Sequence, residues 1–271
     1  MDASEPAFPR SLGVHLLLDE APHYKNSIHD DAVARARGYK AALIPGAFVY
    51  GHISRLAVEA WGAAWVERGA MSVRFRKPAY NHDDIVVSGS STVDDGEAAR
   101  SEVLVRNGDG EEIASGWIAL PREARPSEPS RKLELLLSPE LPPAVAAGEL
   151  PIGGLIRSRE RLLSIDDVDV SRTAFAEDHP LYEKAGFVHP GMLMRLAMGD
   201  VNSGWRFPSA VVLVEAEGQH FRPVFPGQRL RTAGWIDEVY ERKGKHYFVS
   251  QEHLLADGKI AAHFRRTQIY G

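Results

Sequence analysis

NSIHDDAVARARGYKAALIPGAFVY is the sequence of residues 26–50, and the fold of this chain can be predicted outward from it. It places His29 ahead of a Pro45-Gly46 step that opens an apolar helical pattern. A glycine at a helix start leaves backbone N–H groups free, next to the positive end of the helix dipole. Negative charge developing on an oxygen could be held there. The stretch therefore offers a proton-transfer group and an anion-binding helix start.

A long helix followed by strands is predicted downstream of Gly46. Apolar residues recur there at spacings of mainly three and four: Val49, Ile53, Leu56, Ala57, Ala60 and Trp61. Four strand candidates follow, each containing Val or Ile and separated from the next by an Asp-, Asn- or Gly-rich turn: 71–76, 85–93, 98–106 and 112–119. This order predicts an α+β fold in which the sheet wraps the helix.

Composition narrows the class of protein. The chain has 271 residues, 44% of them hydrophobic, enough for one large core or two ordinary domains. The net charge of -5 is spread along the chain without a basic block, so no nucleic-acid partner is expected. The absence of cysteine excludes disulfides and thiolate catalysis. We find no targeting signal and no apolar run near ~18 residues, and expect a cytoplasmic protein without a membrane segment.

The second half of the chain repeats landmarks of the first. Pro190-Gly191 repeats Pro45-Gly46, and the FRP sequence at 221–223 echoes FRKP at 75–78. From the Pro-Gly step onward the offsets run from 145 to 148 residues, as one duplication would give. Between the halves, six of the 17 prolines fall within residues 121–148. We therefore predict an N-terminal domain at 1–121, a Pro-rich linker at 122–150 and a C-terminal domain at 151–271.

The opening stretch resembles the MaoC-like, or (R)-specific enoyl-CoA hydratase, family of hot-dog-fold proteins. That family's fingerprint is Asp, any residue, Asn, Pro, an aliphatic residue and His, then Asp two positions on and a glycine that begins the central helix. The matching residues stand in the same order: Asn26, Ile28, His29, Asp31 and Gly46. Ser27 replaces the proline, and Tyr24 stands where the family has its catalytic Asp. Together with the repeat, the resemblance implies a double hot dog.

The resemblance also implies a function. It predicts an enoyl-thioester hydratase or 3-hydroxyacyl-thioester dehydratase of fatty acid metabolism, acting on an acyl-CoA or acyl-carrier-protein substrate. His29 would be the general base, Asn26 would fix the loop or the water, and Gly46 would hold the developing oxyanion. Ala47 and Tyr50, on the same helix, complete the predicted substrate-binding set. No metal and no cofactor are expected, and a homodimer of the fused chain is compatible with the fold.

Tyr24 keeps three interpretations open. A phenol has a pKa near ~10, so Tyr24 can donate to a water but does not readily take its proton at about pH 7. His29 works alone while Tyr24 positions the water, or Asp30 or Asp31 substitutes for the missing acid. Alternatively, the protein binds acyl thioesters without hydrating them. Asp31 is also predicted to cap a short helix at 32–37.

The second copy of the fingerprint is expected to lack the base, because Tyr182 stands opposite His29. Glu177 and His179 could form an acid–base pair, although a solvated carboxylate beside a structural histidine is favoured. His189 is expected to belong to the entry of the second helix. We hypothesise that this degenerate half is free to widen the acyl tunnel.

Thioester hydrolysis is a third candidate function, since hot-dog thioesterases share the fold. It requires a carboxylate on or near the central helix. Glu59 is the one helical acid before Glu67, and it lies more than about three turns from Gly46. The sequence therefore disfavours this reaction.

Overall fold

The computed structural model describes residues 8–18 and 24–271. Its elements in chain order are β1 (Arg10–His15), α1 (Asp31–Ala36), α2 (Gly46–Trp61), α3 (Ala63–Arg68), β2 (Ala70–Phe75), β3 (Asp84–Gly89), β4 (Val93–Asp94), β5 (Ala98–Asn107), β6 (Glu112–Pro121), β7 (Arg161–Leu162), α4 (Ile165–Ala174), α5 (Pro180–Ala185), α6 (Pro190–Ser203), β8 (Val212–His220), β9 (Arg229–Arg242), β10 (Lys245–Ala256) and β11 (Lys259–Ile269). The four strands predicted in the first half correspond to β2, β3, β5 and β6.

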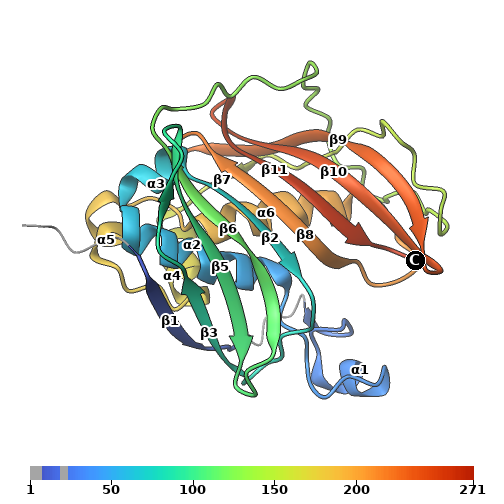
Figure 1. Cartoon of the computed structure of the whole chain (residues 1–271). Coiled ribbons are helices and arrows are strands. Elements are labelled where there is room, and N and C mark those ends of the chain that lie inside the picture. Colours follow the sequence, from blue (N-terminus) through green and yellow to red (C-terminus); the bar gives the residue numbers. More distant parts are fainter. Residues whose placement is uncertain (1–7, 19–23) are drawn as a thin grey trace, which may run out of the picture.

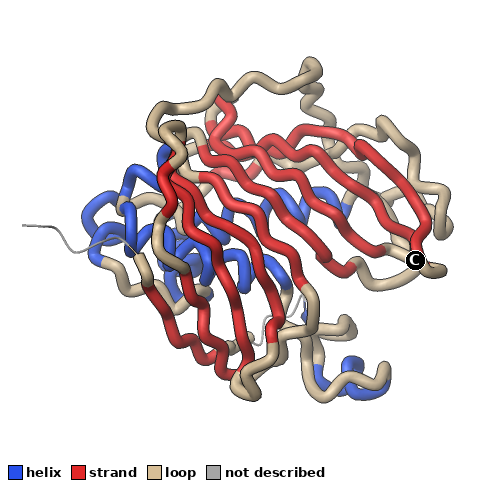
Figure 2. Tube along the Cα trace, in the orientation of Figure 1, coloured by secondary structure: helices blue, strands red, loops and turns tan. Residues whose placement is uncertain are grey.

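One antiparallel sheet runs through the whole chain (Figures 1 and 2). Its strand order is β1-β3-β5-β6-β2-β8-β11-β10-β9-β7, with β4 beside β5. The last five strands mirror the first five about the β2–β8 pair, where Ser72 lies opposite Glu217. The two halves therefore have the same topology, as the sequence repeat predicts.

The helices α2 and α6 pack together on one face of this sheet (Figure 1). Apolar side chains of α2 at the predicted positions, such as Ile53 and Leu56, are fully buried, and one hydrophobic core includes residues of both halves. The helices approach closely at two glycines. A Cβ on Gly191 would lie 2.6 Å from the Cα of Gly51. The predicted α+β double hot-dog fold is confirmed.

The connection between the halves has no helix or strand of its own. All of residues 122–160 are described, and their backbone forms isolated bridges, one within this segment from Leu136 to Arg157 and one to the second half from Ala144 to Arg206. The boundaries at 121 and 151 stay predictions, because the sheet continues without a break from one half to the other. Among the described residues, no helix is both long enough and apolar enough to span a membrane.

Candidate active site

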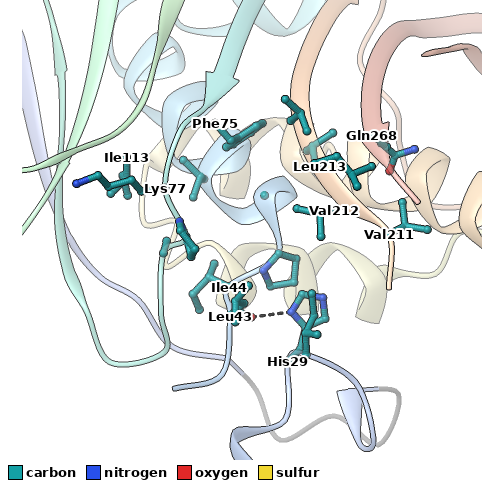
Figure 3. Close-up of a pocket in the computed structure, with 18 of the residues that line it drawn as sticks. His29, Leu43, Ile44, Phe75, Lys77, Ile113, Val211, Val212, Leu213 and Gln268 are labelled. Carbon is teal, nitrogen blue, oxygen red and sulfur yellow. Dashed lines mark hydrogen bonds between the residues drawn. The ribbon is translucent and has the colours of Figure 1, made fainter. Parts of the chain in front are cut away.

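A cavity of about 370 Å³ lies between the N-terminal end of α2, the start of β8 and the C-terminal part of α6 (Figure 3). Both halves of the chain contribute to its lining: Ile28, His29, Tyr39, Leu43, Ile44, Pro45, Gly46, Val49, Phe75, Arg76, Lys77, Pro78, Ala79, Ile113, Met198, Asn202, Val211, Val212, Leu213, Val214, Lys245, Gln268 and Ile269. Most of these side chains are apolar. The cavity therefore suits a hydrocarbon chain and contains the predicted base and helix start.

His29 is held by its own loop in one orientation. Its Nδ1 lies 2.6 Å from the carbonyl oxygen of Leu43, and its backbone N–H donates to Ser27 Oγ at 3.1 Å. A carbonyl oxygen only accepts hydrogen bonds, so Nδ1 carries the proton. In the neutral ring, Nε2 is then the nitrogen that can accept a proton. The loop thus selects the tautomer that a general base needs.

The two acids that follow His29 have structural partners. Asp30 is the N-cap of α1 and accepts from the N–H groups of Ala32 and Val33. Asp31 instead accepts the N–H of Ala42 at 2.6 Å, and this hydrogen bond lowers the pKa of its carboxyl. The prediction that Asp31 caps the short helix is wrong, because the cap lies one residue earlier. Neither carboxylate lines the cavity.

The start of α2 faces the cavity without a side-chain cap. Pro45 is the N-cap residue, and its side chain makes no capping hydrogen bond. Gly46 lines the cavity, and a Cβ at this position would lie 2.9 Å from Leu213 Cδ2. The first residue of a 16-residue helix therefore lies at the cavity, where the positive end of the helix dipole can stabilise negative charge.

The structure places Ala47 and Tyr50 in the core and not at the cavity. Both side chains are 0% exposed. The Tyr50 hydroxyl lies against Gly218, whose Cβ, if present, would be 2.0 Å from it. Burial raises the pKa of Tyr50 far above its usual value. These residues fix α2 against the sheet, and their contact with substrate stays a prediction.

Tyr24 and Asn26 lie on the loop that leads to His29. The Tyr24 hydroxyl accepts a hydrogen bond from Arg195 Nη2 of α6 at 2.8 Å. Its ring meets the His29 ring edge-on, with centroids 5.4 Å apart. Asn26 is exposed and has a φ of 63°, a left-handed conformation that asparagine tolerates in turns. The structure therefore brings Tyr24 to His29 and places Asn26 in the turn between them, and their catalytic roles stay predictions.

The start of α6 corresponds to the start of α2 in the repeat, but side chains of the protein occupy the space in front of it. His189 is its N-cap, and its Nδ1 accepts the N–H of Gly191 at 3.0 Å. The Phe175 ring stacks on the His189 ring at 4.3 Å, and the Tyr182 ring lies near it at 5.4 Å. All three side chains are buried. His189 belongs to the helix entry as predicted, and the filled space argues against a widened tunnel in this half.

Glu177 is buried, contrary to the prediction of a solvated carboxylate. Its side chain is 0% exposed, and Oε2 lies 3.3 Å from His189 Nε2 without an aligned hydrogen bond. His179 donates its backbone N–H to Glu177, while its ring caps α5. Burial opposes ionisation of Glu177, but the contacts with His189 and with Arg55, 3.6 Å away, outweigh it and lower its pKa. Burial also lowers the pKa of His189, so the pair consists of a carboxylate and a neutral imidazole.

Three features of the site carry no signal in the sequence. The acceptor for His29 is a backbone carbonyl, that of Leu43, which any residue could supply. Arg195 reaches Tyr24 from 171 positions away in the chain. Gln268 and Asn202 line the same cavity from the second half. Local motifs cannot reveal contacts that depend on how the two halves pack.

Solved structures of known proteins share this architecture. A protein described as a MaoC domain dehydratase from Chloroflexus aurantiacus superposes with a TM-score of 0.66, at 13% identity over 97% of this chain and 95% of that chain. A Mycobacterium tuberculosis protein described as having a double hotdog fold gives 0.63, at 15% identity over 96% of both chains. A protein described as an oleoyl thioesterase from Lactobacillus plantarum gives 0.53, at 9% identity over 96% and 95%. No protein-family model and no curated protein matches the sequence.

At these identities the likeness establishes the fold. The chain is a double hot-dog protein with the architecture of MaoC-like dehydratases, and the resemblance drawn from residues 26–50 is confirmed at this level. Dehydratases and thioesterases both occur among the neighbours, so the reaction has to be argued from the site.

Proposed function

We propose that this protein adds water to an enoyl thioester, or removes it from a 3-hydroxyacyl thioester. The observation that carries the proposal is that His29, oriented by the contact of its Nδ1 with Leu43 O, lines the same cavity as Gly46. The fold is consistent with it, because neighbours of this architecture are described as dehydratases and thioesterases.

In this proposal, one base and one helix start perform the reaction. His29 Nε2 takes a proton from water as the water oxygen bonds to C3 of the enoyl group. The electron pair of the double bond moves through C2 to the thioester oxygen, where the N–H groups at Gly46 stabilise it. His29 then returns the proton to C2, so the net change is the addition of one water. Tyr24 acts as a positioning residue through its edge contact with the imidazole.

The edge of the cavity suits an anionic carrier. Arg76 and Lys77 line it and are about half exposed, with side-chain exposures of 52% and 50%. Arg76 pairs with the partly buried Glu112, and Lys77 pairs with the exposed Glu111. Such surface pairs are weak and exchange readily for other anions. We infer that the phosphates of coenzyme A or of a carrier-protein prosthetic group lie here.

The lining also favours hydration over hydrolysis. Among the described residues that line the cavity there is no Asp or Glu, so no carboxylate is placed to attack a thioester or to activate water for that attack. A single histidine is sufficient for the two proton transfers of hydration, which use the same base in sequence.

A second candidate is an acyl-thioester-binding protein without catalysis. Tyr24 favours it, because the residue at the family's Asp position is a tyrosine whose hydroxyl is already bound to Arg195. A protein of this kind would keep the cavity and lose the reaction.

The change in enoyl-thioester absorbance with time distinguishes a hydratase from a protein that binds thioesters without reaction. Purified protein would be tested against short, long, branched and aryl enoyl-CoA substrates, beside His29→Ala, Tyr24→Asp and His15→Ala. His15 is an exposed histidine on β1 and serves as the matched control. We expect turnover that His29→Ala abolishes and His15→Ala leaves unchanged. If the wild type is inert and Tyr24→Asp gains activity, the binding function replaces the proposed reaction.

A further inference from the structure

Two polar groups at the cavity are buried without a hydrogen-bond partner among the described residues. They are Nε2 of Gln268, on β11, and Oδ1 of Asn202, on α6, and both residues line the cavity. Buried polar atoms are rarely left unpaired in folded proteins, and those that are point to a water or a ligand. The two residues that carry them, one with an unpaired donor and one with an unpaired acceptor, both line this mainly apolar cavity.

The orientation of the Gln268 amide is fixed by its neighbour. Arg266 Nη1 lies 3.1 Å from Gln268 Oε1, and both side chains are 0% exposed. A guanidinium only donates, so the amide atom facing Arg266 is the oxygen. The amide nitrogen is therefore the group left to donate elsewhere.

Arg266 is in turn held by a buried carboxylate. Its Nε donates to Glu252 Oε2 at 2.9 Å, and its Nη2 contacts Glu252 Oε1. Ser250 Oγ donates to the same carboxylate at 2.5 Å. The charges of Arg266 and Glu252 cancel, and a buried pair of this kind seldom stabilises a fold more than apolar side chains would. Orienting the Gln268 amide is a use that apolar residues could not serve.

Apart from Arg266 and its partners, the neighbours of Gln268 at the cavity are apolar. Figure 3 shows it beside Leu213 and Val211 on one side of the cavity, with Ile113 on the opposite side. A plain hydrocarbon chain in this cavity would leave both orphan groups unsatisfied. A site that hydrogen-bonds a substrate hydroxyl rejects the analogue without that hydroxyl more strongly than an apolar pocket rejects either substrate.

We propose that Gln268 and Asn202 form a subsite for a hydroxyl group carried by the acyl chain. This deepens the proposed function and rests on it, because the acyl chain is taken to occupy the cavity. A hydroxyl satisfies both groups by accepting from Gln268 Nε2 and donating to Asn202 Oδ1. A carboxylate only accepts, so it would place its charge against the oxygen of Asn202. The substrate class is therefore a hydroxylated acyl thioester.

Binding of saturated acyl-CoA thioesters tests the subsite without requiring a reaction. Isothermal titration calorimetry would compare a plain chain with isomers of the same length that carry one hydroxyl at successive positions beyond C3. We expect one isomer to bind at least about 10-fold tighter than the plain chain, and this ratio to fall to about 1 in Gln268→Leu and in Asn202→Leu. The two variants lie on different elements, so one remains informative if the other does not fold.

Gln251→Leu is the matched control. Gln251 lies on β10, where its side chain contacts His263 and Asp237 and does not line the cavity. It should keep the wild-type ratio. Equal binding of the plain chain and every hydroxylated isomer would overturn the subsite alone, as would a preference that survives in both cavity variants. Absence of binding by every thioester would overturn the proposed function itself.

Discussion

The starts of α2 and α6 share a Pro-Gly step but have opposite environments. At α2 the residue before the step is Ile44, no side chain caps the helix, and Gly46 lines the cavity. At α6 that residue is His189, whose ring takes the N–H of Gly191. Duplication of a helix start does not duplicate a site. The residue before the Pro-Gly step decides whether the first N–H groups of the helix can bind a ligand or are bonded to a side chain of the protein.

The segments at the ends of β2 and β8 have diverged as well. Residues 75–78 line the cavity of His29, and their counterparts at 221–223 line a separate surface pit with Arg68 and Arg122. The second half contributes to the first cavity instead, through β8, α6 and β11. One half therefore supplies the candidate reacting groups, and the other supplies much of the wall.

The largest expected difference is between two alanine variants: His29→Ala at the cavity near α2, and His189→Ala at the N-cap of α6. His29→Ala should lower kcat/KM for an enoyl thioester by about 10²- to 10⁴-fold, because a general base is lost. Its free energy of unfolding should change by less than about 1 kcal/mol, since His29 is half-buried in a loop. Steady-state kinetics and urea unfolding measure the two effects. Full activity in His29→Ala would remove the proposed difference between the starts.

His189→Ala should have the reverse effect. It removes the cap of α6 and the partner of buried Glu177, so we expect the free energy of unfolding to fall by roughly 3 kcal/mol. His189→Asn keeps a capping acceptor and should lose less. Urea unfolding of both variants measures which of them loses more stability. A destabilisation of Asn equal to that of Ala would show that the cap contributes nothing.

The two glycines sharpen the comparison further. Alanine at Gly191 would press on the Gly51 backbone and the Phe175 ring, and overpacking of this kind costs about 2 kcal/mol of stability. Alanine at Gly46 meets a flexible side chain, Leu213, so it should mainly narrow the cavity and lower kcat/KM by about 10-fold. Melting temperatures and kinetics of the two variants test this. Equal loss of stability in both would contradict the distinction.

Acid sensitivity of the fold should come from the buried histidines. Burial lowers the pKa of His220 to about 3, and the same cause does so for His52. Unfolded histidine titrates near ~6.5, so between these values the unfolded chain binds protons that the folded chain does not. The stabilisation is complete above about pH 6.5 and is lost as the pH falls toward 3, by about 2 kcal/mol per histidine from pH 7 to 5.

His220→Leu should flatten this pH dependence, because it removes the titrating ring at similar volume. Asn202→Leu removes no titrating group and should leave the pH dependence unchanged. Urea unfolding between pH 5 and 7 measures both slopes. If the two variants lose the same share of the pH dependence, burial is not its cause.

Much of the site was predictable where a local motif specifies it. His29 and Gly46 lie 17 positions apart in sequence, and the structure brings both to one cavity. The role of Asp31 was misassigned by one residue, because Asp30 and Asp31 are both suitable caps and the return of the loop to Ala42 decides between them. The sequence predicts a solvated Glu177, because its partner Arg55 lies on α2, more than 100 positions earlier, and no local pattern links the two.

The sequence by itself determined the fold class, the duplication and the candidate base. These follow from apolar periodicity, from the repeated Pro-Gly step and from the fingerprint around His29, all of which are local in the chain. Only the tertiary structure decided which helix start is open, where Tyr24 finds Arg195, and that Gln268 and Asn202 reach the cavity of His29. Those outcomes depend on the packing of one half against the other, and such contacts between distant residues leave no pattern in a single sequence.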